Sequence, residues 1–397
     1  MNWKKKSRND WGRLGLNSNK SSKWAISDFV EIIGGGTPKT SISEYWNGSI
    51  PWLSVKDFGN DDRYVFETEK TITNEGLNNS STKLLQKDDI IISARGTVGE
   101  LAMLPFPMAF NQSCYGIRPK DDSIDKTFLY YLLRNSVQLL RKNTHGSVFD
   151  TITRDTFKGI EVEVPSIEEQ VKIAGILSSL DDKIAENKKI NHHLLEQARA
   201  LYRNMIETSV TEVVKLNSIA DIVMGQSPKG DTYNDLKLGL PLINGATDFR
   251  GNINPSKWTS DPKKIAKSGD YIFGVRATIG LTTRVFDNYA IGRGTGSATP
   301  KTAELDEFLF FVLEDLFDYY SNSGSGTVYV NISKNDFEKF ELKLPCMNRI
   351  EEYHFLAKPL MDMRYTNEAE ILRLQKIRDT LLPKLMSGEI SVSQATK

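Results

Sequence analysis

The chain of 397 residues carries the same set of short motifs twice, in the same order. GGTPK at residues 35–39 returns as GQSPK at 225–229, and SARGTVG at 93–99 returns as GVRATIG at 274–280. A third pair, GSVF and GTVY, begins at residues 146 and 326. Because each pair lies 180 to 190 positions apart, the period is far longer than the roughly 20 to 50 residues of a solenoid repeat. The repeat therefore predicts two tandem domains that carry out the same kind of function at two separate places.

The composition is that of a globular protein. Hydrophobic residues make up 39% and charged residues 26%, and the length suits two or three domains. No apolar run approaches the ~20 residues that span a bilayer, and no apolar stretch follows the N-terminal basic residues as in a secretory signal. Two cysteines, Cys114 and Cys346, cannot form a disulfide framework or a Cys-based metal site. We expect a cytoplasmic protein with no membrane contact.

The charge is balanced overall and uneven locally. The formal net charge is zero, which argues mildly against a chain that binds nucleic acid unaided. Residues 1–24, a basic N-terminal arm, hold seven Lys or Arg and one Asp, and residues 257–293 hold seven against three Asp. Such patches suit phosphate contact and are equally common on ordinary solvated surfaces.

Each copy is expected to be an α+β domain of short strands with small helices. β-rich runs at residues 30–33, 90–93 and 160–164 are bounded by turn residues, and apolar spacing predicts a helix over 127–140. The second copy repeats this, with a helix near 305–319. We place the two domains at residues 25–165 and 213–345.

A long helix is predicted after each domain, over residues 166–212 and 346–390, before a tail at 391–397. Ser166 and Glu169 have the spacing of a capping box. Apolar positions then alternate by three and four, the pattern of a helix that packs lengthwise on a partner helix, here over roughly 60 Å. The predicted seam residues are Ile173, Leu177, Leu180, Ile184, Asn187, Leu194, Leu201, Leu360, Asn367, Ile371, Leu374, Leu381 and Leu385.

Polar residues and a proline interrupt this seam. Asn187 and Asn367 occupy equivalent positions, so antiparallel packing would set them face to face and fix the register. The alternative is that each only weakens a partly exposed seam. Pro359 costs about 3 kcal/mol inside a helix, so the second helix is expected to start late or bend there. Arg364 and Arg378 also argue against uniform pairing.

No motif of covalent chemistry is present. The segment at 34–39 lacks the Gly-Lys-Ser/Thr ending of a phosphate loop, and adenine methylase and nuclease motifs are missing. The adjacent His192 and His193 point apart on a helix and are unsuited to chelation. We predict no catalytic, cofactor-binding or metal-binding residue in this chain.

The repeated turns nevertheless carry side chains that suit DNA. An Arg beside glycines can approach a phosphate or a guanine edge, Thr can reach a phosphate oxygen, and amides read base edges. The structural alternative is that the Gly-Thr turns are simple connections, the arginines form salt bridges and Trp52 belongs to the core. The predicted DNA-binding residues are Lys39, Trp52, Lys56, Arg95, Thr97, Asn111, Gln112, Lys229, Arg276 and Thr278.

From about Trp24 onward, the chain resembles the specificity subunit of type I restriction–modification enzymes. The resemblance is carried by GGTPK, YW at 45–46, IPW at 50–52, SARGTVG, PSIEEQ at 165–170 and LLPKLMSGEI at 381–390. It implies that residues 25–165 and 213–345 are target recognition domains 1 and 2, which each read half of a bipartite, asymmetric DNA sequence. It also implies that the two long helices pair as an antiparallel coiled coil around a pseudo-two-fold axis and act as a spacer. The second copy has LPLI at 240–243 in place of IPWL at 50–53, so the two half-sites should differ.

The same resemblance implies partners. Two methyltransferase subunits would dock on the helices, and restriction/translocase subunits would join for cleavage, leaving this chain a monomer within a hetero-oligomer. S-adenosylmethionine, ATP and Mg²⁺ would belong to those partners, as would adenine methylation and endonuclease activity. The alternative is a coiled-coil protein-interaction scaffold that does not bind DNA. An enzyme acting alone on DNA is disfavoured by the missing motifs.

Overall fold

The computed structural model describes residues 23–59, 61–143, 151–276, 278–323 and 331–395. The basic arm before Lys23 and the third repeated motif therefore lie outside the described residues. The chain forms two compact units, Met1–Ala185 with Leu374–Lys397 and Glu186–Arg373. Both long helices contribute a segment to each unit, so the compact units divide within the helices, whereas we drew the domain boundaries at the helix ends.

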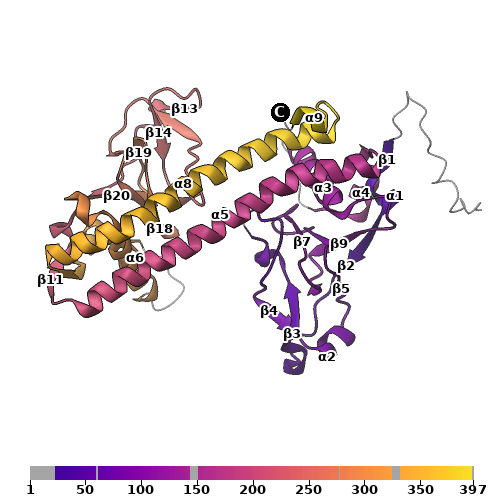
Figure 1. Ribbon diagram of the computed structural model, residues 1–397, viewed down its shortest axis with the longest axis horizontal. Coiled ribbons are helices and arrows are strands. Elements are labelled where there is room, and N and C mark those ends of the chain that lie inside the picture. The colour runs from indigo at the N-terminus through magenta and orange to yellow at the C-terminus, as the bar shows by residue number, and fades with distance from the viewer. Residues whose placement is uncertain (1–22, 60, 144–150, 277, 324–330, 396–397) are drawn as a thin grey trace, which may run out of the picture. The chain divides into compact units, whose positions relative to one another are not determined.

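The first unit contains two four-stranded sheets and a two-stranded ribbon (Figure 1). One sheet has the order β2-β9-β6-β7 and is antiparallel, and the other has the order β4-β3-β8-β5 with β3 and β8 parallel. The ribbon pairs β1 with β10. The strands are β1 (Lys23–Ala25), β2 (Val30–Gly34), β3 (Trp46–Leu53), β4 (Lys70–Ile72), β5 (Leu84–Leu85), β6 (Ile90–Ser93), β7 (Leu101–Met103), β8 (Met108–Phe110), β9 (Cys114–Pro119) and β10 (Glu161–Glu163).

The uninterrupted apolar run of β6 is explained by burial on both of its faces. Ile90 and Ile92 pack into a core with helix α3, whereas Ile91 packs into a second core with residues of the other sheet. Successive residues of a strand point to opposite sides, so a strand between two cores needs apolar residues throughout. The helices of this unit are α1 (Ile26–Phe29), α2 (Asn74–Asn78), α3 (Lys126–Asn143), α4 (Arg154–Gly159) and α9 (Val392–Ala395), with 3₁₀ turns at Ser43–Tyr45 and Val55–Asp57.

The second unit repeats this plan. Strand β17 lies between β20 and β18, and its Ile272 faces one core while Tyr271 and Phe273 face the core that contains helix α6. A five-stranded sheet has the order β13-β15-β14-β19-β16, and a ribbon pairs β11 with β21. The elements are β11 (Thr211–Lys215), β12 (Ala220–Met224), β13 (Tyr233–Asn234), β14 (Leu240–Ile243), β15 (Lys257–Thr259), β16 (Ile265–Ala266), β17 (Tyr271–Arg276), β18 (Thr278–Arg284), β19 (Tyr289–Ile291), β20 (Thr295–Pro300), β21 (Glu341–Pro345), α6 (Asp306–Ser323) and α7 (Lys334–Lys339), with 3₁₀ turns at Leu216–Ser218, Gly230–Thr232, Ala246–Asp248 and Ala303–Leu305.

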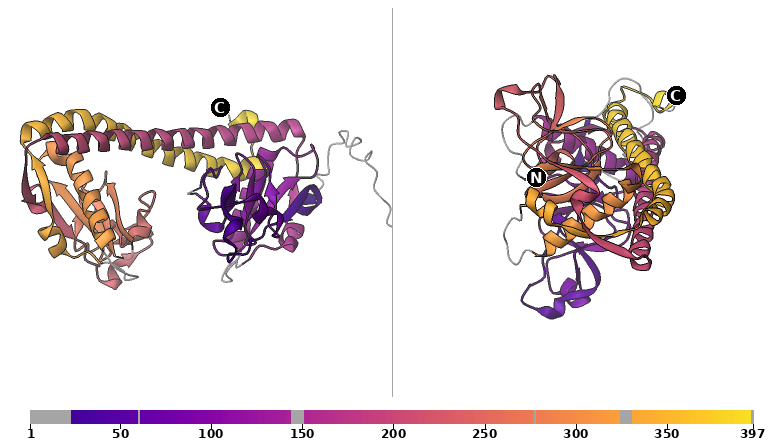
Figure 2. Two further views of the ribbon diagram at one scale, coloured as in Figure 1. Left: turned by 90° about the horizontal axis from the view of Figure 1, so that it is seen from below. Right: turned by 90° about the vertical axis from the view of Figure 1, so that its left-hand side faces the viewer.

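The two long helices are α5 (Ile167–Thr208) and α8 (Met347–Met386), 42 and 40 residues long. Within each unit their segments lie side by side and run antiparallel, as Figure 2 also shows. At the start of α5 the Ser166 hydroxyl accepts the Glu169 backbone N–H at 3.4 Å, which is one half of the predicted capping box. Helix α8 continues through Pro359, so the expected late start is wrong. The fold is therefore the predicted α+β tandem with two long helices.

The buried stripe of the helices drifts away from the predicted heptad. Ile173, Leu177 and Ile184 are buried. Leu180 and Leu201 are only half-buried, and in each case the next residue along the chain is buried instead, namely Asp181 and Tyr202. On α8 the same shift makes Met361, Tyr365 and Leu382 buried in place of Leu360, Arg364 and Leu381. An α-helix repeats every 3.6 residues and a heptad every 3.5, so a straight helix presents a face that moves along the sequence. Asn187, Leu194, Ile371 and Leu385 are buried as predicted, while Asn367 and Leu374 are half-buried.

The two equivalent asparagines do not face each other. In the second unit, Asn187 Nδ2 donates to Glu370 Oε2 at 2.8 Å, and Asn367 Nδ2 donates to Asn191 Oδ1 at 3.0 Å. The predicted contact between Asn187 and Asn367 is therefore wrong, because each amide finds its partner about one helical turn away from the other asparagine.

In the first unit, Arg378 of α8 lies at the centre of a group of charged residues that we call the ionic layer. Its guanidinium donates to Asp181 of α5 at 2.7 Å and to Asp61 at 2.5 Å, and the exposed fraction of Arg378 is 1%. Arg134 of α3 also contacts Asp61 at 2.5 Å, and the Tyr131 hydroxyl donates to Asp181 at 2.5 Å. An arginine in the seam is thus accommodated because carboxylates from two other elements pair with it.

Candidate nucleic-acid interface

The two domains present their repeated motifs on the same backbone frame. In the first, Ala94 N–H donates to the Ser113 carbonyl at 2.7 Å, and Asn111 N–H donates to the Leu53 carbonyl at 2.9 Å. In the second, Val275 N–H donates to Gly294 at 3.0 Å, and Gly292 N–H donates to Ile243 at 2.8 Å. These matching bonds show which residues are equivalent: Arg95 with Arg276, and Gln112 with Arg293.

The GGTPK and GQSPK turns pack against this frame in the same way. A side chain at Gly35 would place its Cβ 2.1 Å from the Asn111 carbonyl oxygen, and one at Gly225 would place it 2.1 Å from that of Gly292. Neither position therefore tolerates a side chain. The turns end at Lys39 and Lys229, and both lysine side chains are exposed to solvent and accessible to a binding partner.

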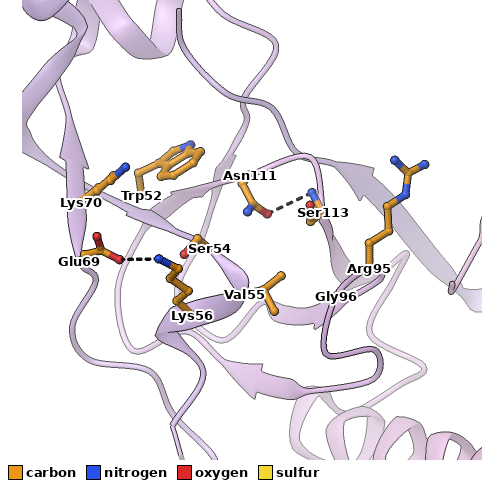
Figure 3. A pocket seen from close by; sticks show the side chains of 10 residues that line it. All are labelled: Trp52, Ser54, Val55, Lys56, Glu69, Lys70, Arg95, Gly96, Asn111 and Ser113. Carbon is orange, nitrogen blue, oxygen red and sulfur yellow. Dashed lines mark hydrogen bonds and ion pairs between the residues drawn. The ribbon is translucent and has the colours of Figure 1, made fainter. Parts of the chain in front are cut away.

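In the first unit, four of the predicted DNA-binding residues line one open pocket of about 370 Å³. Figure 3 shows Lys70 and Glu69 on one side of it and Arg95 on the other, with Asn111 between them. The lining residues are Trp52, Ser54, Val55, Lys56, Glu69, Lys70, Arg95, Gly96, Asn111 and Ser113. Of the remaining predictions in this unit, Lys39, Thr97 and Gln112 are exposed but do not line the pocket.

Trp52 forms part of the wall of this pocket. Its indole N–H donates to the Gly36 carbonyl at 3.1 Å, its ring packs edge-on against Trp46 at 5.2 Å between centroids, and its exposed fraction is 7%. The indole N–H is already used, so Trp52 offers a ligand apolar contact and no hydrogen bond. Lys56 is exposed and lies 4.0 Å from Glu69, a separation that leaves its ammonium free to turn toward an anion.

The amides at the pocket edge are held in position by local contacts. Asn111 Oδ1 accepts the Ser113 backbone N–H at 3.1 Å, and Gln112 Oε1 accepts the Thr37 hydroxyl proton. In each case the amide oxygen accepts a hydrogen bond from a neighbouring residue. The sequence identified both amides, but it did not identify Thr37 as the residue that orients one of them.

In the second unit, Arg276 ends strand β17 at the equivalent of Arg95. Thr278 accepts a hydrogen bond from Arg250 at 2.9 Å, and Val275 bonds to Gly294 next to Arg293. Arg250, Arg276 and Arg293 are exposed, and no acidic partner is found for them among the residues that the structure describes. Arg250 and Arg293 were not predicted as DNA-binding residues. The sequence signal for Arg293 was its place in the basic stretch at 257–293, whereas Arg250 lies before that stretch and had no such signal.

The Cys114 thiol and the side chains able to ligate a metal are the candidates for covalent or metal chemistry within the described ranges. Burial raises the pKa of the Cys114 thiol to about 12, so it is not a nucleophile at neutral pH. No group of three or more His, Cys, Asp or Glu that could hold a metal is found among the described residues. In the same ranges, no helix is long and apolar enough to cross a membrane.

Comparison with known proteins places this arrangement in a family. The model of the type I restriction modification DNA specificity domain matches residues 20–196 and 209–354. The type I restriction enzyme MjaIX specificity subunit of Methanocaldococcus jannaschii is 29% identical over 93% of each chain. The EcoR124I/EcoR124II specificity subunit of Escherichia coli is 30% identical over 46% of each chain. The crystal structure of a type I S subunit from M. genitalium covers 94% of this chain and 98% of its own, with a TM-score of 0.56 at 15% identity, and so shares the fold.

The described fold consists of two tandem α+β domains, each packed with segments of the same two long helices. The chain belongs to the family of type I restriction modification DNA specificity domains, because the two matched segments cover most of its length. It is a DNA sequence-specificity subunit, which is a non-catalytic component of a type I restriction–modification system.

Proposed function

We propose that each of the two domains reads one half of a bipartite, asymmetric DNA target. The observation that carries this proposal is the shared backbone frame, which presents Arg95 in one domain and Arg276 in the other from equivalent positions. Around these arginines the side chains differ, and differing side chains on one frame are what two different half-sites require.

The chain is further proposed to dock two methyltransferase subunits and the restriction/translocase subunits as a monomer within a hetero-oligomer in the cytoplasm. S-adenosylmethionine, ATP and Mg²⁺ are assigned to those subunits, together with adenine methylation and DNA cleavage. The formal net charge of zero fits such a division, because partner subunits can supply part of the phosphate neutralisation.

Binding of the chain together with its methyltransferase subunit to duplex DNA tests this proposal. We expect sequence-selective binding that weakens with rising salt, and a loss of selectivity on Arg95→Ala or Arg276→Ala. Arg154→Ala is the matched control, since Arg154 is an exposed arginine on α4 outside the pocket. Absence of selective binding at every salt concentration would favour the alternative, a protein-interaction scaffold.

A further inference from the structure

We propose that one structurally equivalent position, Gln112 in the first domain and Arg293 in the second, makes the two half-sites differ by reading adenine in one and guanine in the other. This inference rests on the proposed function and deepens it. Both residues are exposed. The residue after each of them accepts, at its carbonyl, the N–H of the residue that precedes Arg95 or Arg276.

The equivalence is fixed by backbone hydrogen bonds on both sides of the position. Asn111 and Gly292 precede it, and each donates its N–H to the end of a neighbouring strand, at 2.9 and 2.8 Å. Ser113 and Gly294 follow it, and the carbonyl of each accepts the N–H of the residue before the shared arginine, at 2.7 and 3.0 Å. A side chain held between two such anchors starts from the same place in both domains.

Gln112 is oriented for adenine. Thr37 Oγ1 donates to Gln112 Oε1, and this oxygen keeps a second lone pair for a further donor. Adenine presents an N6 amino donor and an N7 acceptor side by side in the major groove. The free lone pair of Gln112 can accept from N6 while its amino group donates to N7.

Arg293 is presented for guanine by its two glycine neighbours. A Cβ on Gly292 would lie 2.1 Å from Asn244 Oδ1, and one on Gly294 would lie 2.6 Å from the Asn244 carbonyl oxygen. The backbone therefore lies tightly against Asn244 on both sides of Arg293, and the arginine side chain is exposed. Guanine presents the O6 and N7 acceptors, which a guanidinium contacts with two N–H groups.

The shared arginines do not explain a difference between half-sites. Arg95 and Arg276 are the same side chain exposed at equivalent positions, so the base edge that each contacts is expected to be of the same kind in both domains. The difference then falls on positions where the frame is kept and the side chain is not, and Gln112 with Arg293 is such a position.

Selection of duplexes from a randomised pool by the complex of the full chain with its methyltransferase subunit tests this assignment. Gln112→Arg is expected to change one adenine of the first half-site to guanine, and Arg293→Gln to change one guanine of the second to adenine. The preference at the affected base should shift by about 5- to 150-fold, and the other half-site should stay unchanged. Gln86→Arg makes the same chemical change at an exposed position in the turn between β5 and β6, and both half-sites should remain as in the wild type.

Thr37 provides a second variant with a different readout. Thr37→Val removes the hydroxyl that orients Gln112 and should reduce the adenine preference at the same base only, whereas Thr37→Ser should retain it. If the wild-type complex selects a bipartite sequence and Gln112→Arg and Arg293→Gln leave both half-sites unchanged, the assignment is overturned and the proposed function stands. If the wild-type complex selects no sequence at all, both proposals are overturned.

Discussion

At the scale of single residues, Arg378 is expected to contribute strongly to the stability of the first unit. It is buried against Asp181, which is itself 6% exposed. Arg378→Met would leave a buried carboxylate without its cation, and we expect the free energy of unfolding to fall by about 3 to 5 kcal/mol. Chemical denaturation measures this, with Arg373→Met at an exposed position of α8 as control. A variant as stable as the wild type would show that the ionic layer is dispensable.

Asp61 makes the stability of the first unit depend on acid pH. Burial alone would raise the pKa of Asp61, but Arg134 and Arg378 outweigh burial and hold it below its usual range. The stabilisation is therefore complete above the unfolded-state pKa of about 4 and is lost as the pH falls through the lower folded-state value. We expect Asp61→Asn to flatten the acid limb of thermal stability against pH, and an unchanged acid limb would contradict this.

The partners of Arg378 could not be predicted from the sequence. The seam pattern located the arginine, but Asp61 lies 317 positions away and Asp181 lies 197 positions away. Periodicity reports which face of a helix is buried and says nothing about which charged residues meet it there. The pairing follows from the tertiary packing of three separate elements.

At the scale of elements, the two equivalent asparagines should respond to substitution in opposite directions. Asn187 is buried but bonds to the exposed Glu370, so Asn187→Leu leaves no buried group unpaired and should raise stability by about 1 kcal/mol. Asn367 is the partner of the buried Asn191, so Asn367→Leu should lower stability by about 1 to 3 kcal/mol. Thermal unfolding of the two variants in parallel checks both, and shifts of equal sign would be inconsistent with these pairings.

Pro359 lies within α8 at an exposed position. Proline removes one helical hydrogen bond and clashes with the preceding turn, so Pro359→Ala should increase the free energy of unfolding, by up to about 3 kcal/mol. Denaturation measurements against the wild type test this. A loss of stability would mean that a bend at Pro359 is needed for packing.

The elements themselves were largely predictable. Local pattern located α3, α5, α6 and α8, because long amphipathic segments carry a strong periodic signal. The exact set of buried residues along the helices was not predictable. A three-and-four alternation describes a supercoiled pair of helices, whereas these helices also pack into the domain cores through residues such as Leu177 and Tyr353. The pocket in the first unit could be anticipated only in part, because Lys70 and Ser54 reach it through strand pairing that local sequence does not specify.

At the scale of the whole molecule, the duplication supplies the same backbone frame twice with different side chains. Equivalent hydrogen bonds at Leu53 and Ile243, and at Ser113 and Gly294, keep that frame constant. Under the proposed function, such a frame allows a different sequence to be read without a change of fold, because only the side chains between the backbone anchors differ. The repeat seen in the sequence would then be the structural origin of the proposed two-part recognition site.

Sequencing of the methylated positions in a strain that expresses the chain with its methyltransferase subunit tests the central claim most directly. The expected motif has two specific parts separated by unspecified bases. Arg95→Ala should reduce the base preference in only one part of the motif, and Arg276→Ala should reduce it in only the other. A single uninterrupted motif, or loss of both parts on either substitution, would contradict the account of two independent half-site readers.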